Sequence, residues 1–267
     1  MNIIRIFLTF VKMEFRYNFI SSWSIFGYVV GIFVNLIVYF YTSKALAPNS
    51  AFSGTFLKYG YFEFIVLGEM ILLLTQASLT QAQEIVMRLK LSGVLEQLYF
   101  SRIGVIKSIL TYYIALIINN SFQIILTLLG LIVFFKVHLG FFEILRFIII
   151  MIASSVLFLG IFYLNFIMTI LFKRKNNTLQ HLVNVISFFS GAYFPLEVLA
   201  NEKLKSILLL SPFTALVNFS RTYIYDNKIE ITYLITLLFW LIIPLVVGLV
   251  LYKLLIKPRG GSLYVIG

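Results

Sequence analysis

Polar side chains recur at regular intervals along one long apolar stretch of this chain. Glu69, Gln76 and Gln83 are seven residues apart, and Thr80 falls within the same arc of a helix. A carboxylate in a membrane-spanning helix costs about 3 kcal/mol, so this stripe should face protein or water. For Glu69 two interpretations remain open, the wall of a transport path and hydrogen bonding between packed helices. For the glutamines we favour packing, because neutral amides commonly join membrane helices.

The next apolar stretch carries further amides, Asn119, Asn120 and Gln123, followed by Thr127. Hydrogen bonding between helices is the better interpretation for this group, but its side chains could also line a path. The candidate path residues are therefore Glu69, Gln76, Thr80, Asn120 and Gln123.

Sequence signatures of catalysis are missing from the chain. It has no cysteine and two histidines, which excludes thiolate chemistry and a histidine-rich metal site. It also lacks the G-x-x-x-x-G-K-[ST] loop that binds nucleotide phosphates, and the G-x-S-x-G and HExxH signatures. We therefore expect no catalytic, cofactor or metal site here. Any ATP-driven step would use ATP and Mg²⁺ bound by a separate ATPase subunit.

The charged stretch 84–102, EIVMRLKLSGVLEQLYFSR, joins two apolar stretches. Its charges are too costly for hydrocarbon, so it should lie at one membrane surface. Glu84 and Arg88 are four residues apart, which allows a pair on one helical face. Ser92 and Gly93 interrupt the helix before a second short helix begins. The pattern predicts a short helix that lies along the membrane and is exposed to a partner.

Three motifs carry a family resemblance. They are GVLEQL at 93–98, followed by a Ser-Arg pair; FFSGAYFPL at 188–196; and LLSPFT at 209–214. In this order and separation they resemble the first cytoplasmic loop, the last-but-one span and the returning outer segment of ABC-2 type transporter permeases, which have the type V ABC exporter fold.

The resemblance implies a complex of two permease copies, identical or similar, with two ATP-binding cassette ATPase subunits below them. It implies a transport path between the permeases and a coupling loop at 84–105 that contacts the ATPase. The residues of this sequence that would couple to the ATPase are Glu84, Arg88, Val94, Leu95, Glu96, Leu98 and Arg102.

Composition agrees with an all-α polytopic membrane protein. Of 267 residues, 61% are hydrophobic and 12% are charged. We expect a single transmembrane permease domain over 1–267 with six spans. Their approximate ranges are 23–41, 57–83, 106–135, 144–172, 178–194 and 231–255. The segment 196–230 holds an apolar piece too short to span, and is expected to be re-entrant on the outer side.

The amino-terminal segment 1–18 predicts an amphipathic helix at the membrane surface. Asn2, Arg5, Thr9, Lys12 and Arg16 share one face, and apolar residues occupy the other. Glu14 falls on the apolar side. Two interpretations are open for it: a residue near the helix end that snorkels to water, which we favour, and a contact with another segment of the protein.

Lysine and arginine counts predict the orientation. Segments on one side of the membrane, including both termini and 84–102, carry more of these residues than the other side. The positive-inside rule then places both termini in the cytoplasm, in a bacterial-type cytoplasmic membrane. The net charge of +11 fits contact with anionic lipids, and we expect no nucleic acid as a partner.

These features favour the membrane-spanning subunit of an ATP-driven exporter that moves a hydrophobic or amphipathic cargo, such as a drug, lipid, peptide or lipid-linked glycan. One alternative is an ion-coupled secondary transporter or channel, which would call for paired charges within spans and a repeat. A second is an integral membrane lipid-modifying enzyme, which would call for clustered Asp, Glu or His. The sequence shows neither pattern.

Overall fold

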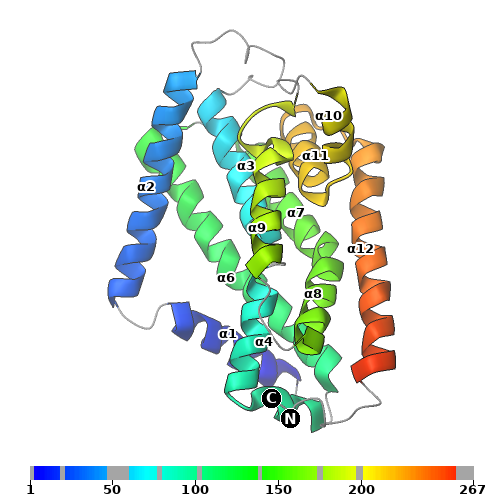
Figure 1. Ribbon diagram of the computed structural model, residues 1–267. Helices are drawn as coiled ribbons and strands as arrows, with labels where there is room; N and C mark the ends of the chain where they lie inside the picture. Colours follow the sequence, from blue (N-terminus) through cyan, green and yellow to red (C-terminus); the bar gives the residue numbers. More distant parts are fainter. Residues whose placement is uncertain are drawn as a thin grey trace.

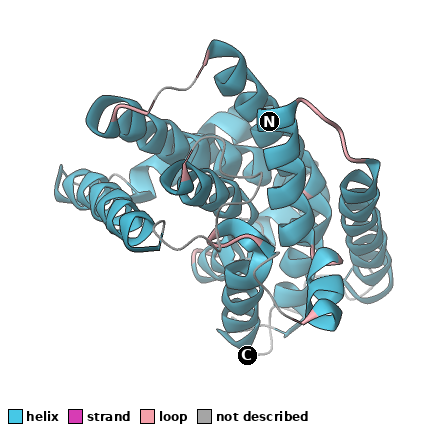
Figure 2. Ribbon diagram, turned by 90° about the horizontal axis from the view of Figure 1, so that it is seen from above, coloured by secondary structure: helices cyan, strands magenta, loops and turns pink. Residues whose placement is uncertain are grey.

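The computed structural model describes residues 3–18, 22–46, 60–76, 80–100, 104–137, 140–172, 177–196 and 201–256 (Figure 1). Every element in these ranges is helical, so the all-α prediction is confirmed for them. A view along the bundle shows helices lying side by side, joined by loops (Figure 2). The helices are α1 (Ile3–Asn18), α2 (Ser22–Leu46), α3 (Tyr61–Gln76), α4 (Ala82–Leu91), α5 (Val94–Phe100), α6 (Gly104–Phe135), α7 (Phe141–Leu157), α8 (Leu159–Phe172), α9 (Asn177–Ser187), η4 (Phe188–Ala192), α10 (Glu202–Leu209), α11 (Pro212–Asp226), α12 (Ile231–Leu251) and η6 (Tyr252–Ile256).

Four helical stretches of the described chain are long and apolar enough to cross a membrane. They cover Phe26–Ala45, Val105–Phe135, Phe141–Phe172 and Ile231–Ile256. Each reaches or exceeds the roughly 20 residues that about 30 Å of hydrocarbon requires. The third combines α7 and α8, which meet at Phe158. These stretches agree with the first, third, fourth and sixth predicted spans, and the chain is a multi-pass membrane protein by this criterion.

The second and fifth predicted spans are less regular. α3 has 16 residues and ends at Gln76, and Gln83 belongs to the separate helix α4. The expected span over 57–83 stays a prediction, because 77–79, between α3 and α4, lie outside the described residues. α9 has 11 residues and continues into η4, where Gly191 has a φ of 87°. A left-handed residue of this kind bends the backbone, and glycine adopts it without the steric cost of a Cβ.

The segment after η4 forms two helices with a sharp bend. α10 and α11 are bent by 84° relative to each other, and together they could count as a fifth span or a re-entrant loop. Ser211 precedes Pro212 at the start of α11, where proline is compatible with a first helical turn. The helices suited to spanning thus number four, or five with this pair, within the described residues.

Two hydrophobic clusters divide the bundle along its length. One joins α2, α3, α7, η4 and α11, and includes Met70, Phe158 and Leu216. The other joins α1, α4, α5, the first half of α6, α8, the end of α12 and η6, and includes Phe10 and Ile256. α1 and α4 consequently lie at one end of the bundle, and α10 and α11 lie at the opposite end (Figure 1).

Glycines allow α8 and α12 to approach each other closely. A Cβ added at Gly160 would collide with the carbonyl oxygen of Leu241. A Cβ at Gly248 would lie 2.8 Å from the ring of Tyr163 and 3.3 Å from the backbone of Leu164. Small residues at such contacts are typical of helix packing in membranes, where close van der Waals contact holds helices together.

Candidate functional site

α4 and α5 form a bent pair at the end of the bundle where α1 lies (Figure 1). Arg88 and Lys90 fall in the last turn of α4, where cations interact favourably with the helix dipole. The amide of Ser92 then bonds to the Arg88 carbonyl, and that of Gly93 to the Lys90 carbonyl. Gly93 has a φ of 68°, which ends α4 and lets α5 start in a new direction.

One face of this pair is buried and the other is open. Ile85, Val86, Leu89 and Leu95 are each at most 3% exposed and pack in the same cluster as Phe10. On the other side, Glu84, Ser92 and Gln97 are exposed, and Leu91 is 84% exposed. We call the exposed part of 84–97 the α4–α5 surface. It combines a charge, polar groups and a large apolar side chain on a backbone fixed from behind.

A buried ion pair joins α4 to α1. Arg88 Nη2 lies 2.9 Å from Glu14 Oε1, and the Glu14 side chain is only 3% exposed. The hydroxyl of Tyr112, on α6, donates to the same carboxylate oxygen. Glu14 therefore does not snorkel to water, and the favoured interpretation of this residue was wrong. The alternative, a contact with another segment of the protein, is confirmed.

The predicted coupling residues divide between the two faces. Glu84 is exposed, Arg88 is partly exposed and pairs with Glu14, and Val94 and Leu98 are partly buried. Leu95 is 1% exposed, so it anchors α5 to the bundle and is not open to a partner. The Glu96 side chain and Arg102 lie outside the described residues.

The predicted polar stripe does not act as one surface. Gln83 Nε2 donates to Asn165 Oδ1 of α8 at 3.2 Å, and both side chains are buried. Gln81 and Asn120 exchange two amide hydrogen bonds at 3.2–3.3 Å. These contacts join α4 to α8, and the residue that precedes α4 to α6, as expected for amides that hold helices together. Thr80 and Gln123 are partly buried, and the Gln76 side chain lies outside the described residues.

Glu69 lies in a different environment, among tyrosines. Its carboxylate accepts a hydrogen bond from the hydroxyl of Tyr193, which follows η4. Tyr39 of α2 lies close enough to interact electrostatically with the same carboxylate. The rings of Tyr39 and Tyr193 have centroids 6.4 Å apart and are tilted by 47°. Tyr61 donates to the Tyr193 carbonyl at 2.6 Å and so helps to fix the position of that residue.

Arg221 of α11 holds the opposite end of the bundle together. Its guanidinium donates to the carbonyl oxygens of Gly191, Ala192 and Phe64, at 2.5–3.0 Å. It also stacks over the Phe64 ring, 3.4 Å from the centroid. The side chain is 3% exposed. Carbonyl oxygens freed by the bend at Gly191 thereby gain a donor that an apolar side chain could not supply.

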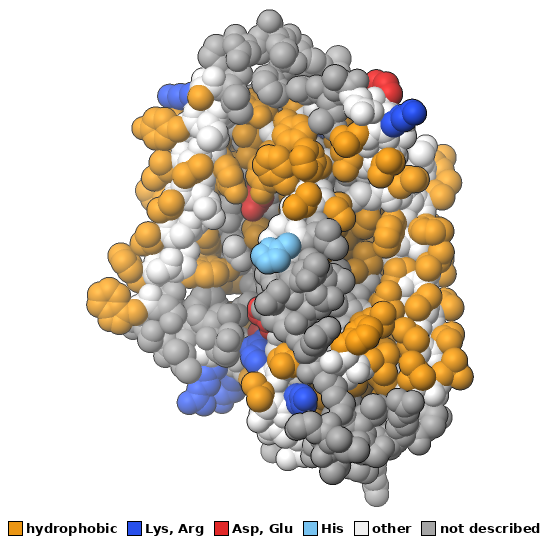
Figure 3. Space-filling model, in the orientation of Figure 1, with side chains coloured by type: hydrophobic (Ala, Val, Ile, Leu, Met, Phe, Trp, Pro, Cys, Tyr) orange, Lys and Arg blue, Asp and Glu red, His pale blue; other side chains and the backbone are white. Residues whose placement is uncertain are grey.

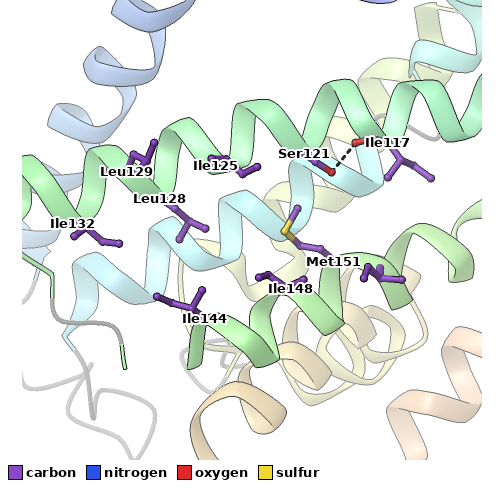
Figure 4. A pocket seen from close by; sticks show the side chains of 10 residues that line it. Ile117, Ser121, Ile125, Leu128, Leu129, Ile132, Ile144, Ile148 and Met151 are labelled. Atoms are coloured by element: carbon purple, nitrogen blue, oxygen red, sulfur yellow. Dashed lines mark hydrogen bonds between the residues drawn. The ribbon is translucent and has the colours of Figure 1, made fainter. Parts of the chain in front are cut away.

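An apolar groove of about 430 Å³ lies between α6 and α7 (Figure 4). Its lining includes Ile125, Leu128, Ile148 and Met151. The hydroxyl of Ser121 points back to the Ile117 carbonyl at 2.7 Å and is satisfied there. The groove therefore offers apolar contact without a polar group for catalysis or orientation.

Sequence reasoning missed several of these residues. Asn165 is a lone amide in an apolar stretch, which is a signal for a contact between membrane helices. Arg221 stands four residues after Val217 on an otherwise buried face, which could have marked it as buried. Tyr39 and Tyr193 gave no local signal, since their role depends on how α2, α3 and η4 are arranged.

No group of three or more His, Asp or Glu among the described side chains could hold a metal ion. Comparison with protein-family models and with curated protein sequences gives no match to this chain.

Proposed function

We propose that this chain is the permease subunit of an ATP-driven exporter of the ABC-2 class, working with a separate ATPase and a second permease copy. The α4–α5 surface carries this proposal. It presents Glu84, Leu91 and Gln97 to the exterior of the bundle, while Leu89 and Leu95 fix its backbone from behind. Such a surface is exposed to a partner on one side and held rigidly on the other. A force that the partner exerts on it would therefore be transmitted into the bundle.

The contacts of α4 supply a mechanical route into the bundle. Arg88 connects it to α1 and, through Glu14, to Tyr112 of α6. Gln83 connects it to Asn165 of α8. A displacement of α4 would therefore be transmitted to helices that cross the membrane. ATP binding in a partner could bias the spans between two arrangements in this way, as linkage requires.

The proposed topology has six passes with both termini in the cytoplasm. Besides the four long helices, α3 with α4 and α9 with η4 run along the bundle, as Figure 1 illustrates. α10 and α11, bent by 84°, would form the re-entrant outer segment. In this arrangement the α4–α5 surface faces the cytoplasm, where an ATPase can reach it.

The cargo is proposed to be hydrophobic or amphipathic. Hydrophobic side chains dominate the bundle exterior over α2 and α12 (Figure 3). Few charged side chains are available in the described spans to line a path for a bulky polar molecule. Lipids, drugs and peptides therefore fit better than an extended glycan.

The test is purification of the tagged chain from its own membranes, with the attached proteins identified by mass spectrometry. The expected partner is an ATPase with the phosphate-binding loop that this chain lacks. Leu91→Glu and Glu96→Arg should weaken its association by about tenfold or more, since disrupting interface anchors commonly costs over 1.4 kcal/mol. Lys12→Glu, an exposed charge reversal on α1, is the matched control.

Transport that continues without any ATPase would contradict the proposal of an ATP-driven exporter. If an ATPase is attached but both α4–α5 variants bind it normally and keep transport coupled, the α4–α5 surface is not the contact.

A further inference from the structure

The tyrosines around Glu69 have a geometry that goes beyond helix packing. The carboxylate sits on α3, facing hydroxyls from two other elements, Tyr39 on α2 and Tyr193 after η4. Glu69 is partly exposed, as are both tyrosines. The acid and the two rings are therefore accessible from the surface of the single chain.

The carboxylate retains capacity to bind a further donor. An ionised carboxylate has about four lone-pair sites, and the Tyr193 hydroxyl uses one of them. Within the described ranges, no Lys or Arg forms an ion pair with Glu69. Arg221, the buried cation in this half of the bundle, is directed to backbone carbonyls and to the Phe64 ring.

The rings add a second attraction for positive charge. Tyr39 and Tyr193 are tilted by 47°, with centroids 6.4 Å apart, so their faces form a corner. Phe188, 51% exposed, packs on Tyr193 with its centroid 5.6 Å away and extends the aromatic wall outward. Aromatic faces attract cations through their quadrupole, and the effect strengthens as water is excluded. A carboxylate beside such a corner selects positive charge over neutral or negative groups.

We propose that Glu69, Tyr39 and Tyr193 form a recognition site for an organic cation with an apolar body. This inference rests on the proposed export function, because it names the class of cargo that would enter at this site. The carboxylate supplies the countercharge that a cation needs within the membrane, and the aromatic wall binds the apolar body. An anionic cargo would be repelled by the carboxylate.

Binding to the purified full-length chain tests the site without any ATPase. The probes are tetraphenylphosphonium and tetraphenylborate, which have nearly the same shape and opposite charge. The parent chain should bind the cation at least about tenfold more tightly than the anion. Equal affinity for both, or no binding of the cation, would overturn the inference.

Three variants locate the binding. Glu69→Gln keeps the side-chain shape and should weaken binding of the cation by about tenfold or more. Tyr193→Leu removes a ring and should also weaken it severalfold, whereas Tyr193→Phe keeps the ring and should bind within about threefold of the parent. Glu63→Gln, on the same helix α3, is the matched control and should bind as the parent does.

The variants also separate recognition from packing. If Glu69→Gln folds with an unchanged melting temperature and still binds the cation normally, the carboxylate does not recognise cargo and the inference fails. If Glu69→Gln does not fold, Tyr193→Leu and Tyr193→Phe carry the test, and equal binding by both refutes the aromatic corner. Failure in this assay leaves ATPase association untouched, so it is distinct from failure of the exporter proposal.

Discussion

Glu14 and Arg88 form an ion pair across 2.9 Å between the first helix and α4, and the two side chains differ in exposure. The carboxylate is 3% exposed and the guanidinium 26%. Removing the arginine would leave a buried carboxylate with the Tyr112 hydroxyl as its described donor, whereas removing the carboxylate leaves a guanidinium that water can reach. Loss of the arginine should therefore destabilise the protein more than loss of the carboxylate.

The first prediction follows from this asymmetry. Arg88→Met should lower the free energy of unfolding in detergent by about 3 kcal/mol, and Glu14→Gln by less. The double variant should recover part of the loss, because it leaves no uncompensated buried charge. Thermal or denaturant unfolding of the four proteins measures this. Strict additivity of the two losses would show that the pair does not contribute as a unit.

A second prediction concerns Arg221. Arg221→Lys keeps the charge but cannot reach three carbonyl oxygens with a planar fork, so unfolding should become easier by about 1–3 kcal/mol. Arg146→Lys is the control, since Arg146 makes one described bond, to the Ile224 carbonyl at 2.9 Å. The melting temperature should fall further for Arg221→Lys than for Arg146→Lys. Equal shifts would mean that the three contacts of Arg221 add no stability.

Apolar length made much of this fold predictable. α2, α6, α7–α8 and α12 fall within a few residues of the predicted spans, because crossing hydrocarbon demands about 20 consecutive apolar residues. Hydropathy does not report whether the helix over 57–83 is continuous, and 77–79 lie outside the described residues.

The candidate site was harder to predict, because its contacts join residues far apart in the sequence. Gly93 correctly marked the bend between α4 and α5 through its local backbone requirement. The burial of Leu95 and the pairing of Glu14 depend on α1 covering α4 and α6, which no periodicity in 84–102 reports. Glu69 was singled out from its cost in a membrane, but its tyrosine partners come from other elements.

A third prediction tests the proposed orientation. The chain has no cysteine, so single cysteines report directly on accessibility. Ser92 on the α4–α5 surface and Ser206 on α10 are both exposed, at opposite ends of the bundle. A membrane-impermeant maleimide added to intact cells should label Ser206→Cys, and should label Ser92→Cys only after the membrane is opened. The reverse pattern would place the α4–α5 surface outside the cell and exclude ATPase contact there.

The last prediction concerns the contact between α8 and α12. A Cβ at Gly160 would collide with the Leu241 carbonyl oxygen, which belongs to backbone and cannot rotate away. Gly160→Ala should therefore separate the two helices and cost about 1–3 kcal/mol, outweighing the 0.5–1 kcal/mol or so that alanine gains in helix propensity.

The matched control is Gly31→Ala on α2, where an added Cβ meets nothing within 4 Å. There only the propensity gain remains, so the melting temperature in detergent should stay level or rise, while that of Gly160→Ala should fall. Because α12 ends beside the helices that carry the α4–α5 surface, Gly160→Ala should also reduce any coupling of ATP hydrolysis to export. A melting temperature for Gly160→Ala at or above that of Gly31→Ala would mean that α8 and α12 adjust freely, and that their close contact does not hold the bundle together.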